Sequence, residues 1–148
     1  MFENIFRMLF GNHNQNNRYT QSCRSRCAPR FVYQLVPFEQ AKAMIEEDKV
    51  TLIDVRTENE YDLMHIKNAI NIPVDDIEKK IFMYEQTCPI MIYCSSGARS
   101  KTALQILNQL GYTNIYIWEY GALATFPYKN MLVYGENVRR GNENGKTY

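Results

Sequence analysis

A single cysteine, Cys94, stands where a short apolar run ends and a polar loop containing one glycine begins. The run, Ile90–Tyr93, has the length and β-branched content of a buried strand, and a helical pattern opens at Ser100. A thiol placed there lies at a helix N-terminus, where unpaired N–H groups and the helix dipole favour an anion. The pattern therefore predicts a reactive thiolate. The alternative is a structural cysteine, because free cysteines are often buried and inert.

The loop from Cys94 to Arg99 has the spacing Cys-x4-Arg. Gly97 allows the backbone to curl so that its N–H groups point inward as an anion nest. Arg99 adds a positive charge that does not deprotonate. The longer spacing Cys-x5-Arg suits phosphatase chemistry, because that loop wraps a phosphoryl group. A loop one residue shorter fits one extra sulfur atom on the cysteine better, so the spacing favours sulfur transfer and leaves a Cys-dependent phosphatase as the lesser alternative.

Strand and helix patterns alternate along the chain and must position this loop. We expect strands at 31–35, 50–55, 69–72, 90–93 and 114–118, and helices at 37–47, 57–64, 75–84 and 100–110. Thr57 and Glu60 have the spacing of a capping box, Ser100 is expected to cap its helix, and Gly111 to end it. Such alternation predicts an α/β domain with a mostly parallel central sheet and helices on both faces. In such sheets a site lies beyond the carboxyl ends of the strands, where Cys94 is expected.

The composition and charge of the chain limit the classes of function that we expect. The 148 residues are 45% hydrophobic and 22% charged with a net charge of +1, so one soluble domain is expected and nucleic acid is not an implied partner. Residues 1–30 carry five arginines against one glutamate and predict a flexible basic arm, followed by a domain at 31–134 and a polar tail at 135–148. Residues 1–10 are apolar but short and interrupted by charge, so membrane contact and a secretory signal are not expected. A reducing cytoplasm suits a nucleophilic thiol.

Several motifs in order resemble the rhodanese (sulfurtransferase) family over about residues 33–128. They are Leu52-Ile53-Asp54-Val55-Arg56 with Glu58, Glu60-Tyr61 and His65-Ile66, then Asn68-Ala69-Ile70-Asn71-Ile72-Pro73, then Cys94-Ser95-Ser96-Gly97-Ala98-Arg99-Ser100, and finally Gly111-Tyr112-Thr113-Asn114-Ile115-Tyr116 with Gly121. The resemblance implies a single rhodanese-like domain. The chain departs from the family at Met64 and Asn68, where glycine is frequent, and at Tyr120, where a Gly-Gly pair is usual.

The resemblance and the loop together predict a sulfurtransferase. Cys94 is the expected nucleophile, and its persulfide is expected to be held by the loop, mainly through backbone groups of Ser95, Ser96, Gly97, Ala98 and Arg99. Arg99 is also expected to stabilise the loop and attract anionic donors. The donor is thiosulfate or a persulfide, and many thiosulfate-using members carry a basic residue where this chain has Ser95. The alternative is a persulfide carrier or binding module without turnover.

Further residues have supporting roles in this prediction. The resemblance implies that the 50–55 and 90–93 strands are neighbours, which would bring Asp54 and Arg56 near the loop. We expect Asp54 to accept hydrogen bonds from loop backbone groups, with a general-base role as the alternative. Arg56 is either a partner for Glu60 or a residue at the lip that steers an anionic donor. His65 is expected in a turn with a structural hydrogen bond, rather than as a partner of the thiolate.

The other cysteines and the histidines do not predict a metal site. Cys23-x3-Cys27 lacks a second pair, and His13 and His65 are the only histidines, so neither a structural metal nor an organic cofactor is expected. Cys88 precedes the 90–93 strand and should lie roughly 20 Å from Cys94, too far to resolve a persulfide. Cys23 and Cys27 could reach Cys94 from a flexible arm, and the alternative is that they have no part in the chemistry. The expected partners are a small sulfur donor and acceptor, or a persulfide-bearing protein.

Overall fold

Five parallel strands form the central sheet of residues 32–135, the part of the chain that this computed structural model describes. The strands are β1 (Gln34–Leu35), β2 (Thr51–Asp54), β4 (Ile70–Asn71), β5 (Ile90–Tyr93) and β6 (Ile115–Ile117). Their order across the sheet is β1-β6-β5-β2-β4, and every neighbouring pair is parallel. β5 is therefore the central strand, with β2 on one side and β6 on the other.

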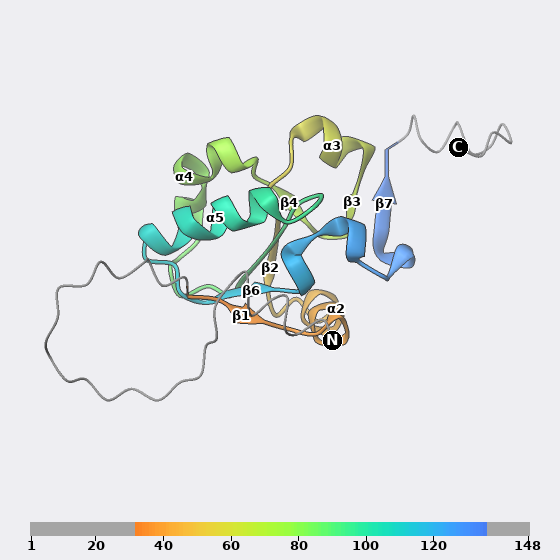
Figure 1. The fold of residues 1–148 in the computed structure, drawn as a ribbon, viewed down its shortest axis with the longest axis horizontal. Coiled ribbons are helices and arrows are strands. Elements are labelled where there is room, and N and C mark those ends of the chain that lie inside the picture. The colour runs from red at the N-terminus through yellow and green to blue at the C-terminus, as the bar shows by residue number, and fades with distance from the viewer. Residues whose placement is uncertain (1–31, 136–148) are drawn as a thin grey trace, which may run out of the picture.

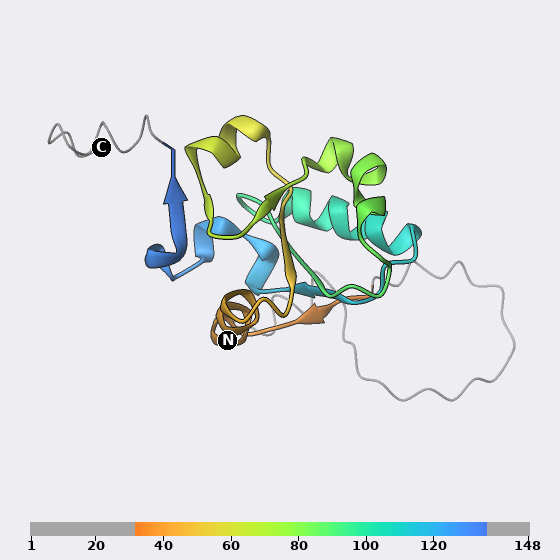
Figure 2. The ribbon, with the colours of Figure 1, turned by 180° about the vertical axis from the view of Figure 1, so that it is seen from behind.

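Helices cover both faces of this sheet, as predicted (Figure 1). Helix α2 (Phe38–Glu46) lies on one face, while α4 (Ile77–Lys80) and α5 (Ala98–Gln109) lie together on the other, and Figure 2 shows the same layers from behind. Helix α3 (Glu58–Leu63) follows β2. The short 3-10 turns are Val74–Asp76, Ile81–Met83, Glu119–Gly121, Leu123–Thr125 and Lys129–Met131.

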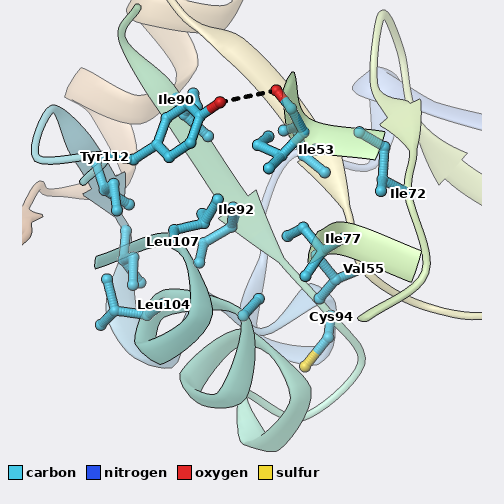
Figure 3. Close-up of a cluster of buried hydrophobic side chains, with 14 residues drawn as sticks. Ile53, Val55, Ile72, Ile77, Ile90, Ile92, Cys94, Leu104, Leu107 and Tyr112 are labelled. Atoms are coloured by element: carbon cyan, nitrogen blue, oxygen red, sulfur yellow. Dashed lines mark hydrogen bonds between the residues drawn. The ribbon is translucent and has the colours of Figure 1, made fainter. Parts of the chain in front are cut away.

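The buried strand β5 contributes side chains to two hydrophobic cores, because its side chains alternate between the two faces of the sheet. Ile90 and Ile92 pack with the cluster under α4 and α5, which Figure 3 draws, whereas Met91 and Tyr93 pack with the cluster on the α2 side. Cys94 continues the first set and belongs to the α5-side cluster. The pleat of β5 thus directs the cysteine toward the helix that follows it.

A small second sheet was not predicted. Strand β3 (Met64–Ile66) pairs antiparallel with β7 (Leu132–Tyr134), with His65 opposite Val133. The expectation of a turn at His65 was therefore wrong, and β7 is a strand beyond the last one predicted at 114–118. Each strand is only three residues long, so neither carries enough periodicity to be distinguished from a loop.

The start of α5 also differs from the prediction. Gly97 is the N-cap residue, with a left-handed φ of 97°, and the helix begins at Ala98. Ser100 is therefore inside the first turn and does not cap the helix. The C-terminal end agrees with the sequence, since α5 ends at Gln109 and Gly111 follows with a φ of 88°. The helix predicted over 75–84 is broken into single turns around α4.

The predicted basic arm at 1–30 and nearly all of the predicted tail at 135–148 lie outside the described residues. Cys23, Cys27 and the apolar residues 1–10, on which the sequence analysis made predictions, lie there too. Within residues 32–135, the helices are too short and too polar to cross a lipid bilayer.

Candidate functional site

Cys94 lies directly beyond the carboxyl end of β5, at the position that the sheet topology predicts for a site. Its backbone is fixed on both sides. The Cys94 N–H donates to the Gly121 carbonyl at 2.9 Å, and the Leu123 N–H donates to the Cys94 carbonyl at 2.7 Å. These bonds add residues 121–123 to the sheet as a short parallel bridge beside Cys94. The cysteine is therefore held by its main chain, and its side chain is left for chemistry.

The Cys94 sulfur is buried and lies inside the loop that leads into α5. Sγ accepts a hydrogen bond from the Gly97 N–H at 3.0 Å. Figure 3 shows the sulfur directed away from Val55 and Ile77, toward the start of α5. The first N–H groups of a helix have no partner within that helix, and the helix dipole is positive at this end. Negative charge on the sulfur is therefore favoured at this point.

Gly97 is required for the shape of this loop. Its φ of 97° is in the left-handed region that side chains rarely adopt, and a Cβ there would lie 2.4 Å from the Tyr120 carbonyl oxygen. Tyr120 itself has a φ of 58°, in the position where the family usually has glycine. The loop and the 120–121 turn therefore pack against each other through main-chain atoms, without room for a side chain.

Ser100 fixes the same turn from the other side. Its buried hydroxyl donates to the Gly121 carbonyl at 3.0 Å, and that carbonyl also accepts from the Cys94 N–H. Ser100 therefore supports the loop through this hydrogen bond rather than as the predicted helix cap. By linking the first turn of α5 to the Gly121 carbonyl, Ser100 sets the position of the helix N-terminus relative to the sulfur.

Glu60, on α3, joins the loop from the opposite side. Its carboxylate accepts from the Arg99 guanidinium at 2.5 and 2.8 Å and from the Ser95 hydroxyl at 2.9 Å. Arg99 Nη2 also donates to Ser95 Oγ at 3.1 Å. The same carboxylate accepts the N–H and hydroxyl of Thr57 at 3.2 and 3.0 Å, and the Glu60 N–H donates to Thr57 Oγ1, which completes the predicted capping box. Glu60 thus takes part in the capping box at the start of α3 and also binds the loop.

This clamp shifts the ionisation of both partners. The hydrogen bonds from Arg99 hold the pKa of Glu60 well below its ordinary value, with smaller contributions from Ser95 and Thr57. The hydrogen bond to Glu60 in turn raises the pKa of Arg99. Glu60 is therefore a permanent carboxylate near neutral pH and is unsuited to carry protons in a reaction.

Arg56 does not take either of its predicted roles. It pairs with Asp54, with Arg56 Nη2 at 2.6 Å from Asp54 Oδ2, and both side chains are buried. Nη2 also donates to the Met64 carbonyl at 2.6 Å. Glu60 is bound by Arg99 instead, and a buried guanidinium cannot steer a donor from the lip. Arg56 pairs with Asp54 because this carboxylate is only two residues away and lies at the same end of β2.

Asp54 has a structural role, as expected, but it binds Arg56 rather than the backbone groups of the Cys94 loop. Besides the Arg56 side chain, it accepts the Arg56 backbone N–H at 2.9 Å, directly after β2 ends. Asp54 lies opposite Tyr93 in the sheet, so the predicted adjacency of β2 and β5 is confirmed. Burial, and next the charge of Asp54, raise the pKa of Tyr93, whose hydroxyl accepts the Ile66 N–H at 3.1 Å. This buried network supports the strand end beneath the loop.

His65 and Cys88 are placed away from the chemistry. The His65 ring stacks on Tyr61 at 3.8 Å between centroids, and its Nδ1 lies 2.8 Å from the Tyr61 carbonyl oxygen, as a structural role requires. Cys88 precedes β5, at the end of that strand opposite Cys94. It lines a cavity of about 380 Å³ between the starts of β2 and β5, so this cavity does not contain the nucleophile.

The predicted loop residues are brought together, with Glu60 as the residue whose site role the sequence reasoning missed. Cys94, Ser95, Gly97 and Arg99 all contribute contacts within the loop, and the side chains of Ser96 and Ala98 are exposed. Glu60 was noted only as a helix cap and as a partner for Arg56. Among residues 32–135 no three acidic, histidine or cysteine side chains gather in a way that could hold a metal ion.

Comparison with known proteins gives one family and several relatives. Residues 38–124, more than half of the chain, match the model of the family described as Rhodanese-like domain. The Escherichia coli K12 thiosulfate sulfurtransferase PspE is 34% identical over 65 residues, covering 43% of this chain and 62% of that protein. The tRNA uridine(34) hydroxylase of Erwinia tasmaniensis is 27% identical over 112 residues, covering 72% of this chain and 29% of that protein.

Among solved structures, a rhodanese-related protein from Thermoplasma volcanium superposes with a TM-score of 0.55 at 30% identity, covering 64% of this chain and 90% of that chain. The matches to the two curated relatives span less than two thirds of the length of each. The two relatives are named for different activities, so membership of this family does not by itself identify the reaction.

Proposed function

Because the chain belongs to the rhodanese-like domain family, we propose that it is a sulfurtransferase that works through a persulfide on Cys94. It moves a sulfane sulfur from a donor, thiosulfate or a persulfide, to a thiophilic acceptor. The observation that carries the proposal is the position of the Cys94 sulfur, at the carboxyl end of β5 and 3.0 Å from the Gly97 N–H. The sulfur, a loop N–H donor and the start of helix α5 meet at this point.

In the first step the Cys94 thiolate attacks the outer sulfur of the donor. A new S–S bond forms to Cys94, the S–S bond of the donor breaks, and its electron pair leaves with sulfite or with a thiolate. Cys94 becomes a persulfide whose terminal sulfur carries the negative charge. No electrons are gained or lost overall, because the donor supplies the sulfur in the oxidation state that the persulfide keeps.

The loop stabilises the product of this step. The Gly97 N–H already points at Sγ, and the first N–H groups of α5 lie at the positive end of a helix of 12 residues. Such donors are fixed by the fold and need no rearrangement when charge develops, which is the usual basis of anion stabilisation at a site. The bonds of Cys94 and Ser100 to the Gly121 carbonyl hold this arrangement in place.

In the second step a nucleophilic acceptor attacks the terminal sulfur. The bond between the two sulfurs of the persulfide breaks, the acceptor leaves with the sulfur, and the Cys94 thiolate is restored. A small thiol, cyanide or a cysteine of another protein has the required nucleophilicity. A protein acceptor would make the chain a persulfide carrier in practice, so small-molecule turnover distinguishes the two forms of the proposal.

The proposal is tested by thiocyanate formation from a sulfane donor and cyanide. Wild-type protein should turn over, Cys94→Ser should fall below about one tenth of that rate, and the matched variant Cys88→Ser should retain it. Turnover retained in Cys94→Ser would contradict the proposal. Hydrolysis of an aryl phosphate without any thiocyanate would instead favour the Cys-dependent phosphatase.

A further inference from the structure

The charged side chains at the mouth of the loop satisfy one another. Glu60, Ser95 and Arg99, which we call the loop clamp, are linked by four hydrogen bonds between their side chains. The two charged members are each 34% exposed, so the ion pair lies at the surface beside the loop that holds Cys94. The Arg99 charge predicted to attract anionic donors is thus already paired with a carboxylate.

We propose that Glu60 is a specificity-determining residue that cancels the charge of Arg99 and selects against dianionic sulfur donors. The inference rests on the proposed sulfurtransferase function. The preferred donor class is one whose transferring end carries a single negative charge or none, such as the persulfide of a thiol or of a protein cysteine. Thiosulfate, with two negative charges, is disfavoured by the same arrangement.

The electrostatic argument follows from the geometry. A guanidinium paired in two-pronged fashion with a carboxylate presents a dipole rather than a net charge, and the attraction of a dipole falls off faster with distance. The backbone N–H groups of the loop then provide the attraction for a donor. These groups suffice for one negative charge, but the cost of removing an ion from water rises steeply with its charge, so a dianion is penalised more.

A role of Glu60 in proton transfer is not consistent with its surroundings. Its carboxylate accepts five hydrogen bonds, two of them from Thr57 at the start of α3 and three from the loop. Such bonding stabilises the ionised form at every pH at which the thiol chemistry operates. Glu60 therefore acts through charge and position.

The test compares two donors that react alike and differ in charge. Thiosulfate carries two negative charges and methanethiosulfonate carries one, and each transfers its outer sulfur with sulfite or methanesulfinate as leaving group. In Glu60→Gln, the ratio of kcat/KM for thiosulfate to that for methanethiosulfonate should rise about fivefold or more. The matched control is Glu58→Gln, which removes an exposed negative charge two residues earlier on α3 and should leave the ratio within about twofold.

A second readout does not depend on sulfur transfer. Alkylation of Cys94 by iodoacetate, which is anionic, and by iodoacetamide, which is neutral, reports the charge at the loop mouth, with the modified cysteine identified from its peptide. The iodoacetate-to-iodoacetamide rate ratio should rise about fivefold in Glu60→Gln and stay near wild type in Glu58→Gln.

The outcomes separate the two proposals. An unchanged alkylation ratio and donor ratio in Glu60→Gln, with sulfur transfer intact, would overturn the inference and leave the proposed function standing. Equal losses with both donors would reduce Glu60 to a positioning residue and also overturn it. A raised alkylation ratio without transfer from any donor would support the charge effect and contradict the proposed function. No alkylation of Cys94 by either reagent would contradict both.

Discussion

Glu60 and Arg99 are 39 residues apart in sequence and meet in a two-pronged ion pair, with Nη1–Oε2 at 2.5 Å and Nη2–Oε1 at 2.8 Å. The pair joins α3, which follows β2, to α5, which follows β5. Because these neighbouring parallel strands end at the same edge of the sheet, the two helix starts are brought within reach of each other. One carboxylate thereby couples the start of a helix to the shape of the loop around Cys94.

The ion pair predicts a specific dependence of stability on pH. The folded-state pKa of Glu60 is lowered, so its contribution is fully present above the unfolded value of about 4.3 and is lost as pH falls through the lower folded value. The difference in free energy of unfolding between wild type and Glu60→Gln should therefore be constant from pH 7 to about 5 and shrink toward pH 2. Urea unfolding at several pH values measures it. A difference that grows on acidification would contradict this assignment.

The buried Asp54–Arg56 pair predicts a large loss of stability when it is broken from one side. Arg56→Ala leaves the Asp54 carboxylate buried without its partner and should lower the free energy of unfolding by about 3–5 kcal/mol. The double variant Asp54→Asn/Arg56→Leu removes both charges and should lose less than Arg56→Ala alone. Chemical denaturation of the three proteins makes the comparison. A loss below about 1 kcal/mol in Arg56→Ala would show that the pair is not desolvated as described.

Gly97→Ala should disrupt the loop while the rest of the fold remains. The added Cβ would lie 2.4 Å from the Tyr120 carbonyl oxygen, and the alanine would also have to adopt a φ of 97°. Strain of this kind costs on the order of 1–3 kcal/mol, and the displaced Gly97 N–H would no longer donate to Sγ. Sulfur loading of Cys94 should fall at least about tenfold. Ala98→Gly, one residue later at an exposed position, is the control and should load nearly normally.

Most of the fold was predictable because its determinants are local. The apolar run before Cys94, the glycine in the loop and Gly111 after α5 each mark a boundary within a few residues, and β5 and α5 lie there. The capping box of Thr57 and Glu60 likewise placed the start of α3. Strands β3 and β7 were missed because three residues carry too little periodicity.

The candidate site was predictable in its nucleophile and loop, but not in its charge pairing. Arg56 was expected to face Glu60 or the lip, whereas the fold gives Arg56 to Asp54 and Glu60 to Arg99. Arg56 and Asp54 are two residues apart, so their pairing is local in the sequence. The pairing of Glu60 with Arg99 depends on the packing of α3 against the loop, which the sequence does not reveal. The helix cap was predicted at Ser100, three residues too late, because the glycine that gives the loop its shape also caps the helix.

The central claim is that Cys94 accepts a sulfur atom as a persulfide, and intact-mass analysis after exposure to a sulfane donor tests it most directly. The full chain, with peptides mapped to distinguish Cys94 from Cys23, Cys27 and Cys88, should gain about 32 Da at Cys94 and return to its original mass on addition of cyanide. Cys94→Ser should show no such gain. A gain located at another cysteine, or retained in Cys94→Ser, would contradict the account, as would a wild-type protein that takes up no sulfur from thiosulfate or from a persulfide.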